Sequence, residues 1–275
     1  MATVVIPAHN EETVVGAGVK TLLDGAEPGE FEVIVVANAC SDRTAEVARK
    51  AGARVVETAE PGKANALRLG DAACRSFPRV YLDADVRLSA ASARALVAAA
   101  RRPGVLACAP VPDLDMAGVG WLSRRLHKVQ ERLVEPTRGL AGTGVYVLSE
   151  EGHARVFPMP DVISDDGYVH ASFAPHERVV VSEARSLVRP SRTLSANLNR
   201  RVRVRMGNRQ LEELGRPVSE RRLSLGDLWG LLRARRVSPL DAGCFLAVLV
   251  MDKALTRLRA QRGGQVSWGT DATTR

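Results

Sequence analysis

Apolar positions follow two different patterns along the first 110 residues of the chain. Short runs rich in β-branched residues alternate with longer stretches in which apolar residues recur every three or four positions. The runs predict buried strands, and the longer stretches predict amphipathic helices that connect them. The strands are expected at Thr3–Ile6, Glu32–Val36, Arg54–Glu57, Arg79–Leu82 and Val105–Ala109, and the helices at Glu12–Leu23, Thr44–Ala51, Lys63–Ser76 and Ser89–Arg101. This alternation predicts an α/β fold, Rossmann-like, with a mostly parallel central sheet and flanking helices.

The pattern becomes largely helical after residue 110. The expected elements are a helix over Met116–Glu135, a glycine-rich turn over Gly139–Gly144, a strand over Val145–Leu148, and helical stretches over Thr193–Leu214 and Leu223–Arg262 with Pro217 and Pro239 as breaks. We therefore expect one α/β domain over residues 1–214. Residues 215–275 are expected to form a helical C-terminal extension with flexible last residues.

The net charge of +8 is concentrated toward the C-terminus. Much of it lies beyond residue 184 in arginines that include Arg200, Arg201, Arg203 and Arg205. A basic surface of this kind attracts nucleic acid, an anionic membrane face or a phosphorylated substrate. Aromatic residues, on which nucleic-acid bases stack, make up 4% of the chain. We therefore expect no nucleic-acid partner and keep nucleic-acid binding as the less favoured alternative.

Cysteine spacing and the N-terminus bear on the cellular compartment. The cysteines show no paired spacing, so neither a disulfide framework nor a zinc cluster is indicated. The chain begins with an apolar strand and shows no signal-peptide pattern, so we expect a cytoplasmic protein. The longest uncharged stretch, Ala242 to Met251, is too short to span a bilayer. The C-terminal helices are expected to pack on the domain, with peripheral membrane contact or homodimer formation as alternatives.

Polar segments follow the first two predicted strands directly. In open α/β sheets, ligands bind beyond the carboxyl ends of the strands. Pro7, Ala8, His9 and Glu11 follow the first strand, and Asn38 follows the second. The amide of Asn38 can pair with the edge of a nucleotide base because it offers both donors and an acceptor. Each segment alone is also compatible with an ordinary turn into a capped helix.

Two carboxylates follow the fourth predicted strand, in Asp83-Ala84-Asp85. Hard divalent cations bind carboxylate and phosphate oxygens together, so a metal held here can bridge the phosphates of a nucleotide diphosphate. Lys63 begins a predicted helix after Gly62, and a helix N-terminus with a lysine also suits a diphosphate. Short acidic pairs are also common in solvated loops.

Taken in order, these segments resemble the inverting nucleotide-sugar glycosyltransferases of family 2, which have the GT-A fold. Pro7 to Glu11 matches the family's Pro-x-x-Asn-Glu type opening, and Ala37 to Thr44 matches its Asp-Asp-Gly-Ser type loop in part, with Asn38 at the second acid. Gly62-Lys63 is similar to its glycine-lysine helix start, and Asp83-Ala84-Asp85 to its Asp-x-Asp element. Ile163 to Tyr168 resembles its Thr-Glu-Asp element. The resemblance covers about residues 2–210.

The resemblance implies roles for individual residues. Asp85, together with Asp83, is expected to hold Mn²⁺ or Mg²⁺, and Asp166 is expected to be the general base that deprotonates the acceptor. The residues expected to bind the donor are Pro7, Ala8, His9, Glu11, Asn38, Lys63, Asp83, Ala84 and Arg203. Two alternatives stay open: Asp165 and Asp166 can simply favour a helix N-terminus through its dipole, and Arg203 can belong to a solvated basic helix face.

The expected function is therefore metal-assisted, inverting transfer of a sugar from a nucleotide diphosphate donor, a UDP-sugar, to an acceptor hydroxyl. Residues 1–214 would form the GT-A glycosyltransferase domain. The acceptor is a glycan, a lipid-linked molecule or a small molecule. The closest alternative enzyme is a sugar nucleotidyltransferase, which binds a nucleotide and a metal on a similar sheet. Such an enzyme would be expected to carry a glycine-rich loop with arginine and lysine after the first strand, and that loop is missing.

Overall fold

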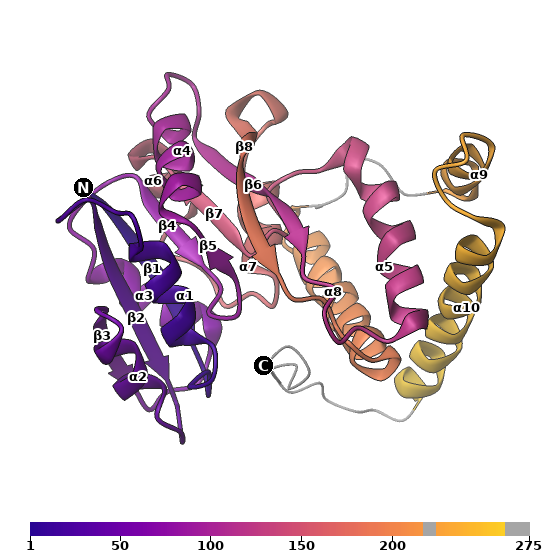
Figure 1. Ribbon diagram of the computed structural model, residues 1–275, viewed down its shortest axis with the longest axis horizontal. Coiled ribbons are helices and arrows are strands. Elements are labelled where there is room, and N and C mark those ends of the chain that lie inside the picture. Colours follow the sequence, from indigo (N-terminus) through magenta and orange to yellow (C-terminus); the bar gives the residue numbers. More distant parts are fainter. Residues whose placement is uncertain (217–223, 262–275) are drawn as a thin grey trace.

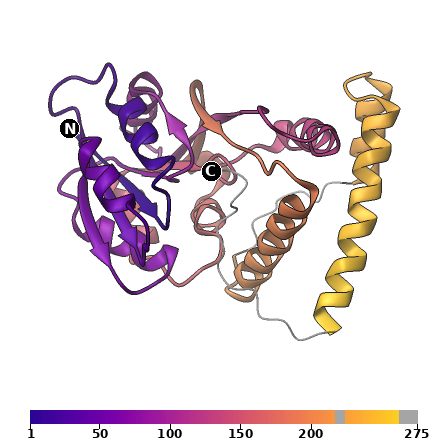
Figure 2. The ribbon, with the colours of Figure 1, turned by 60° about the horizontal axis from the view of Figure 1, so that its bottom comes forward.

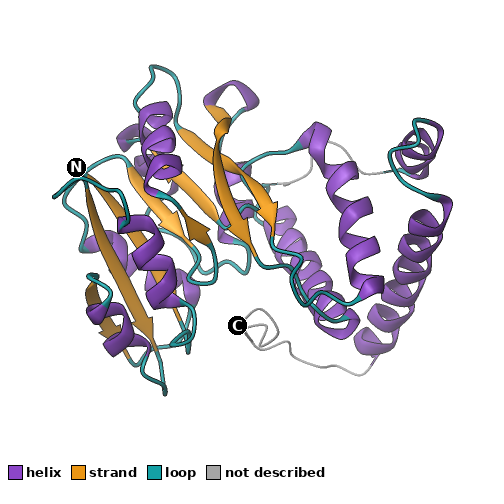
Figure 3. Ribbon diagram, viewed as in Figure 1, coloured by secondary structure: helices purple, strands orange, loops and turns teal. Residues whose placement is uncertain are grey.

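The computed structural model describes residues 1–216 and 224–261 and has one eight-stranded sheet at its centre (Figures 1 and 3). The strand order is β3-β2-β1-β4-β7-β6-β8-β5. β7 and β5 run antiparallel to their neighbours, and the other strands share one direction. The strands are β1 Ala2–Ala8, β2 Phe31–Asn38, β3 Arg54–Thr58, β4 Arg79–Leu82, β5 Arg87–Leu88, β6 Ala107–Leu114, β7 Val145–Leu148 and β8 Arg178–Val188. The prediction of a mostly parallel α/β sheet is confirmed.

Helices cover both faces of the sheet because the central strands are apolar on both sides. Val4 and Ile6 of β1 belong to one hydrophobic cluster, and Val5 between them belongs to another. The helices on the first face are α1 Val15–Leu23, α2 Thr44–Lys50 and α4 Ala90–Ala100. Those on the second face are α3 Lys63–Ala72, α6 Glu150–Val156 and α7 Asp165–Ala171. Alternating side chains along a buried strand thus anchor two helical layers.

The strands predicted from apolar runs are all present, but two strands were missed. β8 has buried residues mainly at alternate positions in its second half, and its outward positions include Glu183, Arg185 and Leu187. Because polar residues interrupt the apolar ones, a search for apolar runs does not identify this strand. β5, the other missed strand, has only two residues. β6 extends past its predicted end at Ala109, to Leu114.

The remaining helices form a second packing unit beside the sheet. These are α5 Trp121–Val134, α8 Leu194–Glu213, α9 Leu225–Arg233 and α10 Pro239–Gln261. Leu126 and Val129 of α5, Leu198 of α8 and Phe245 of α10 share one hydrophobic cluster. The expected packing of the C-terminal helices is therefore observed. α9 and α10 contact each other and α5, and α10 also contacts α8; α5 and α8 lie within the predicted domain of residues 1–214.

Figure 2 places α10 at the edge of the molecule, on the side away from the sheet. Within residues 1–216 and 224–261, no helix has both the length and the apolar character that crossing a membrane requires. The expectation of flexible last residues falls largely on 262–275, which lie outside the described residues.

Candidate active site

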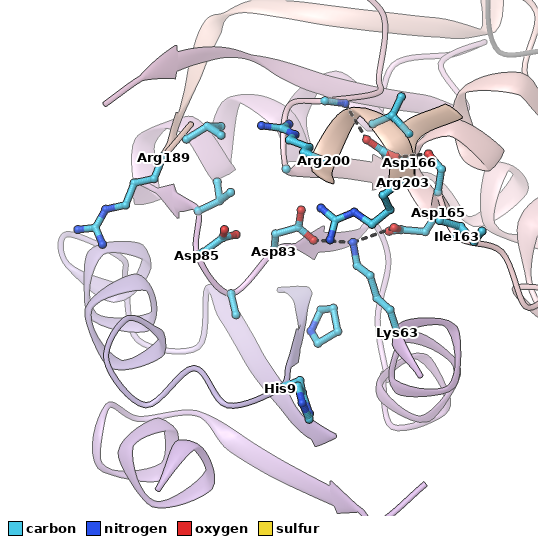
Figure 4. A pocket seen from close by; sticks show the side chains of 18 of the residues that line it. His9, Lys63, Asp83, Asp85, Ile163, Asp165, Asp166, Arg189, Arg200 and Arg203 are labelled. Carbon is cyan, nitrogen blue, oxygen red and sulfur yellow. Dashed lines mark hydrogen bonds and ion pairs between the residues drawn. The ribbon is translucent and has the colours of Figure 1, made fainter. Parts of the chain in front are cut away.

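A polar cavity of about 230 Å³ lies beyond the carboxyl ends of β1 and β4 (Figure 4). It is lined by residues from the ends of these strands, from the starts of α3 and α7, and from β8 and α8. Of the residues predicted to be functional, the cavity wall includes Pro7, His9, Glu11, Lys63, Asp83, Ala84, Asp85, Asp166 and Arg203. Sequence segments spread over about 200 residues thus meet at one site, as the strand-end rule predicts.

Lys63 connects two of the acidic segments. Its Nζ lies 2.7 Å from Oδ1 of Asp83 and 2.7 Å from Oδ1 of Asp165, as Figure 4 shows. Gly62 precedes the helix with a φ of +139°, a conformation that favours glycine, so α3 can begin at Lys63. Burial opposes the charge of Lys63, but Asp165 and Asp83 outweigh it and raise its pKa. The lysine is therefore a fixed cation between the end of β4 and the start of α7.

Asp85 is a half-buried carboxyl beside a second negative charge. Burial and the charge of Asp83 raise its pKa, against the opposing effect of Arg200 and Lys63. The end of β4 is held in place by the backbone N–H of Asp83, which donates to the carbonyl of Gly144 at 2.9 Å. The negative charge of this carboxylate pair is incompletely compensated, so a bound cation would stabilise its ionised form.

Asp166 is held by three donors at the start of α7. Its Oδ2 accepts from the N–H of Gly142 at 2.7 Å, and its Oδ1 accepts from Ser164 Oγ and the N–H of Gly167, both at 2.8 Å. Burial alone would raise its pKa, but Lys63 and these hydrogen bonds outweigh burial and lower it. Asp166 is thus an ionised carboxylate of fixed orientation.

Asp165, next to Asp166, is shifted in the opposite direction. Its pKa is raised by burial and by the charges of Asp166 and Asp83, although Lys63 opposes the shift. Asp165 was considered from the sequence only as a helix-dipole residue. Its ion pair with Lys63, about 100 positions away, has no local sequence signal.

The β1 loop reaches the cavity, whereas the end of β2 stays behind it. The Nδ1–H of His9 donates to the backbone carbonyl of Asn38 at 2.7 Å, which joins the two loops. Asn38 is 1% exposed, and neither it nor Ala8 lines the cavity. Among the described residues, the side-chain amide of Asn38 has no hydrogen-bond partner. The predicted base contact from Asn38 therefore stays a prediction.

Two arginines of the cavity wall were not selected from the sequence. Arg200 lies in the basic stretch of α8 together with Arg203, and Arg189 follows the end of β8. Arg200 could be found from the helical spacing, because positions 200 and 203 share one helix face. Arg189 was missed together with strand β8. The three arginines add cationic groups to a cavity wall that also carries the carboxylates, and Figure 4 shows Arg203 close to Asp83 and Asp165.

The metal-ligating side chains are few. Within the described part of the chain, no group of three or more His, Cys, Asp or Glu residues is arranged to hold a metal ion. Asp83 and Asp85 can supply two carboxylates, so a divalent ion would need further oxygen ligands. A nucleotide diphosphate has such oxygens.

Comparison with known proteins gives one sequence-family match. The sequence model of glycosyl transferase family 2 matches residues 3–152, more than half of the chain. No curated protein matches the sequence. The matched segment includes most of β1, Lys63 and the Asp83–Asp85 element, all of which contribute to the cavity wall.

Solved structures share the fold. Glucosyl-3-phosphoglycerate synthase from Mycobacterium tuberculosis, in complex with Mn²⁺ and UDP-glucose, is 21% identical over 79% of this chain and 80% of that chain, with a TM-score of 0.54. The same enzyme with Mn²⁺, UDP-glucose and phosphoglyceric acid is 20% identical with the same coverage and a TM-score of 0.56. A structure described as a mycobacterial protein is 22% identical over 69% of this chain and 65% of that chain, with a TM-score of 0.48.

The two synthase structures confirm the predicted GT-A fold, and the family match decides between the two enzyme classes considered from the sequence. The family match confirms the transferase expectation, and the nucleotidyltransferase alternative is set aside. On the match over residues 3–152, the chain belongs to glycosyl transferase family 2.

Proposed function

We propose that the cavity catalyses inverting transfer of a sugar from a UDP-sugar to an acceptor hydroxyl, assisted by Mn²⁺ or Mg²⁺. The observation that carries the proposal is the meeting of two acidic pairs, Asp83 with Asp85 and Asp165 with Asp166, in one cavity with Lys63 between them. One pair suits a metal and its diphosphate, and the other suits the proton of an acceptor.

The donor end of the cavity is assigned to Asp83 and Asp85. The raised pKa of Asp85 marks a carboxyl that gains from a nearby cation, so these residues fit a divalent ion. When bound, such an ion neutralises the charge that develops on the departing diphosphate. The glucosyl-3-phosphoglycerate synthase structures, which contain Mn²⁺ and UDP-glucose on a similar fold, support this choice of metal and donor.

The donor itself would lie along the loops of the cavity wall. Lys63 and Arg203 would face the diphosphate, and His9, Glu11 and Pro7 would border the nucleoside. Lys63 already binds two carboxylates, so it would hold a phosphate as a shared partner. Ala8 and Asn38 would act from behind this wall by shaping the β1 and β2 loops, and Ala84 would line the cavity between the two acids.

Asp166 is the proposed base. Its three hydrogen bonds leave one of about four lone-pair positions for an acceptor hydroxyl. Its lowered pKa keeps it ionised at neutral pH. Such a base accepts the proton only as attack on the sugar makes the hydroxyl acidic. Asp165 is held by Lys63 and would position the start of α7.

The acceptor is assigned only by class. A glycosyl transfer needs a nucleophilic hydroxyl, and the similar synthase structure holds phosphoglyceric acid beside its donor. A small-molecule acceptor is therefore the proposal, with a glycan or a lipid-linked molecule as alternatives for an acceptor screen. We place the reaction in the cytoplasm, where reduced cysteines such as the four free thiols here persist.

A thermal-shift panel of nucleotide sugars, with and without Mn²⁺, tests the donor and the metal together. A ligand at about 100 times its Kd stabilises the folded state by about 2.7 kcal/mol, which is measurable as a rise in Tm. We expect UDP-sugars to raise the Tm only when Mn²⁺ or Mg²⁺ is present. Equal stabilisation in EDTA would contradict the metal requirement. Inversion would be established if NMR shows that the anomeric configuration of the sugar in the product is opposite to that in the donor.

A further inference from the structure

Over residues 239–252, helix α10 has two apolar faces, and within the described part of the chain one of them packs on other helices. Its inner face contributes Ala242, Phe245 and Val248 to the cluster shared with α5, α8 and α9. Two buried carboxylates hold this face at its ends. Asp241 binds Arg125 and Lys128 at 2.5 and 2.9 Å, and Asp252 binds Arg201 at 2.9 Å and also Arg205. The orientation of the helix is therefore fixed.

The opposite side, the α10 outer face, is apolar and open. Its large residues are Leu240, Leu246, Val250 and Met251, which are 57%, 37%, 68% and 44% exposed. They recur at helical spacing, and Gly243 and Ala247 between them are exposed too. No charged residue occurs from Ala242 to Met251. A continuous exposed apolar surface of this kind marks an interaction site.

Exposed basic and aromatic residues adjoin the outer face in sequence. Trp229 of α9 is 62% exposed, and Arg233, Arg235 and Arg236 are exposed just before α10. Arg236 binds Glu135 at 2.6 Å. Within the described residues, no carboxylate pairs with Arg233 or Arg235. A tryptophan and arginines that directly precede an apolar helix face in the sequence have the composition of an interfacial membrane element.

We propose that the α10 outer face, with Trp229 and the arginines that precede α10, docks on an anionic lipid surface. The apolar side chains would enter the boundary between headgroups and acyl chains, and the arginines would lie at the anionic headgroups. A second copy of the chain fits less well. Within residues 224–251 the only carboxylates are Asp227, which caps α9 through Ser224, and buried Asp241, so an identical face has no acidic partner for these arginines.

Flotation of the full chain with vesicles tests the proposal. The vesicles are phosphatidylcholine alone or phosphatidylcholine mixed with phosphatidylglycerol, and we expect binding to the mixed vesicles that weakens as salt is added. Leu246→Glu should weaken this binding at least about tenfold. Leu187→Glu is the matched control, since Leu187 lies on β8 and is also 37% exposed. It should bind as the unaltered protein does.

A second pair of variants tests the charge. Arg233→Gln should weaken binding to the mixed vesicles about fivefold, because one arginine at a lipid surface contributes about 1 kcal/mol. Arg101→Gln removes an exposed arginine at the end of α4 and should have no effect. Circular dichroism of each variant verifies that it is folded.

Three outcomes would overturn the proposal. One is absence of binding to the mixed vesicles. Another is equal binding by folded Leu246→Glu and Leu187→Glu. The third is a concentration-dependent dimer, measured by light scattering, that Leu246→Glu abolishes, since this would assign the face to a second copy. Sugar transfer to a soluble acceptor is a separate measurement, so the membrane contact and the proposed function can fail independently.

Discussion

Carboxylates have opposite electrostatic surroundings in the cavity at the strand ends and in the packing unit of α5, α8, α9 and α10, which we call the helical cluster. In the cavity, burial and a neighbouring carboxylate raise the pKa of Asp85 and that of Asp165. In the helical cluster, Asp241 has two cationic partners and a pKa below its usual range, because hydrogen bonds from Lys128, Ser238 and Arg125 outweigh its burial. Asp252 is likewise bound by two arginines.

The difference separates a binding site from a structural connection. Like charges held together cost stability and persist where a ligand or a reaction uses them. Paired charges at the start and in the middle of a packed helix, as at Asp241 and Asp252 of α10, instead fix its orientation. We therefore expect carboxylate removal to cost activity but little stability in the cavity, and stability but little activity in the helical cluster.

The largest effect should come from Asp166→Asn. The amide keeps the size of the side chain but cannot take a proton, so transfer should fall by about 10²- to 10⁴-fold. Donor affinity, measured by calorimetry, should stay nearly unchanged. Asp161→Asn is the control, since Asp161 lies outside the cavity wall and its side chain is 84% exposed. Retained turnover in Asp166→Asn would contradict the base assignment. It would also contradict the expectation that carboxylate removal in the cavity costs activity.

Asp85→Asn should act on donor binding rather than on folding. Loss of a metal-ligating carboxylate should weaken Mn²⁺-dependent binding of the UDP-sugar by about 10- to 100-fold in calorimetry. Without donor, the variant should be as stable as the unaltered protein or slightly more stable, because the repulsion from Asp83 is gone. Unchanged donor affinity would argue against the metal site, and a large fall in Tm would show that Asp85 is structural.

Asp241→Asn should show the reverse behaviour. The asparagine loses the charge that holds Arg125 and Lys128, whose side chains are 35% and 54% exposed. Because water can solvate both cations, we expect a loss of about 1–2 kcal/mol, below that of a fully buried pair. Urea denaturation measures this loss, while turnover at temperatures below unfolding should be unchanged. A fall in turnover with unchanged stability would connect α10 to the reaction.

The two regions also differ in how far the sequence predicts them. The strands β1 and β2 are buried on both faces and are nearly continuous apolar runs, so they and the loops after them can be predicted from local sequence. Strand β8 carries polar residues at outward positions, and Arg189 after it was missed for that reason. The packed C-terminal helices were expected, but the carboxylates that orient α10 were not.

The parts of the site that escaped prediction depend on long-range contacts. The sequence places Lys63 at a helix start, but not between Asp83 and Asp165. It also places Asn38 at the end of a strand, where an amide can reach a ligand. The contact of His9 with the Asn38 carbonyl and the 1% exposure of Asn38 keep it behind the cavity wall. Local patterns thus locate the site, and tertiary packing decides which side chains line it.

The smallest effect is a pH dependence of opposite sign in the two regions. In the unfolded chain an aspartate has a pKa of about 3.9. The folded pKa of Asp241 lies below this value, so its contribution to stability is complete above about pH 5 and is lost as the pH falls. The folded pKa of Asp85 lies above it, so its cost to stability is absent in acid and develops as the pH rises through that pKa.

Melting temperatures of the unaltered protein, Asp241→Asn and Asp85→Asn between pH 3 and 7 measure both effects. At neutral pH, Asp241→Asn should melt below the unaltered protein, and Asp85→Asn should melt at or slightly above it. On acidification, both differences should shrink toward zero, since a protonated aspartate and an asparagine carry the same charge. Differences of the same sign for the two variants would mean that the cavity and the helical cluster use their carboxylates alike.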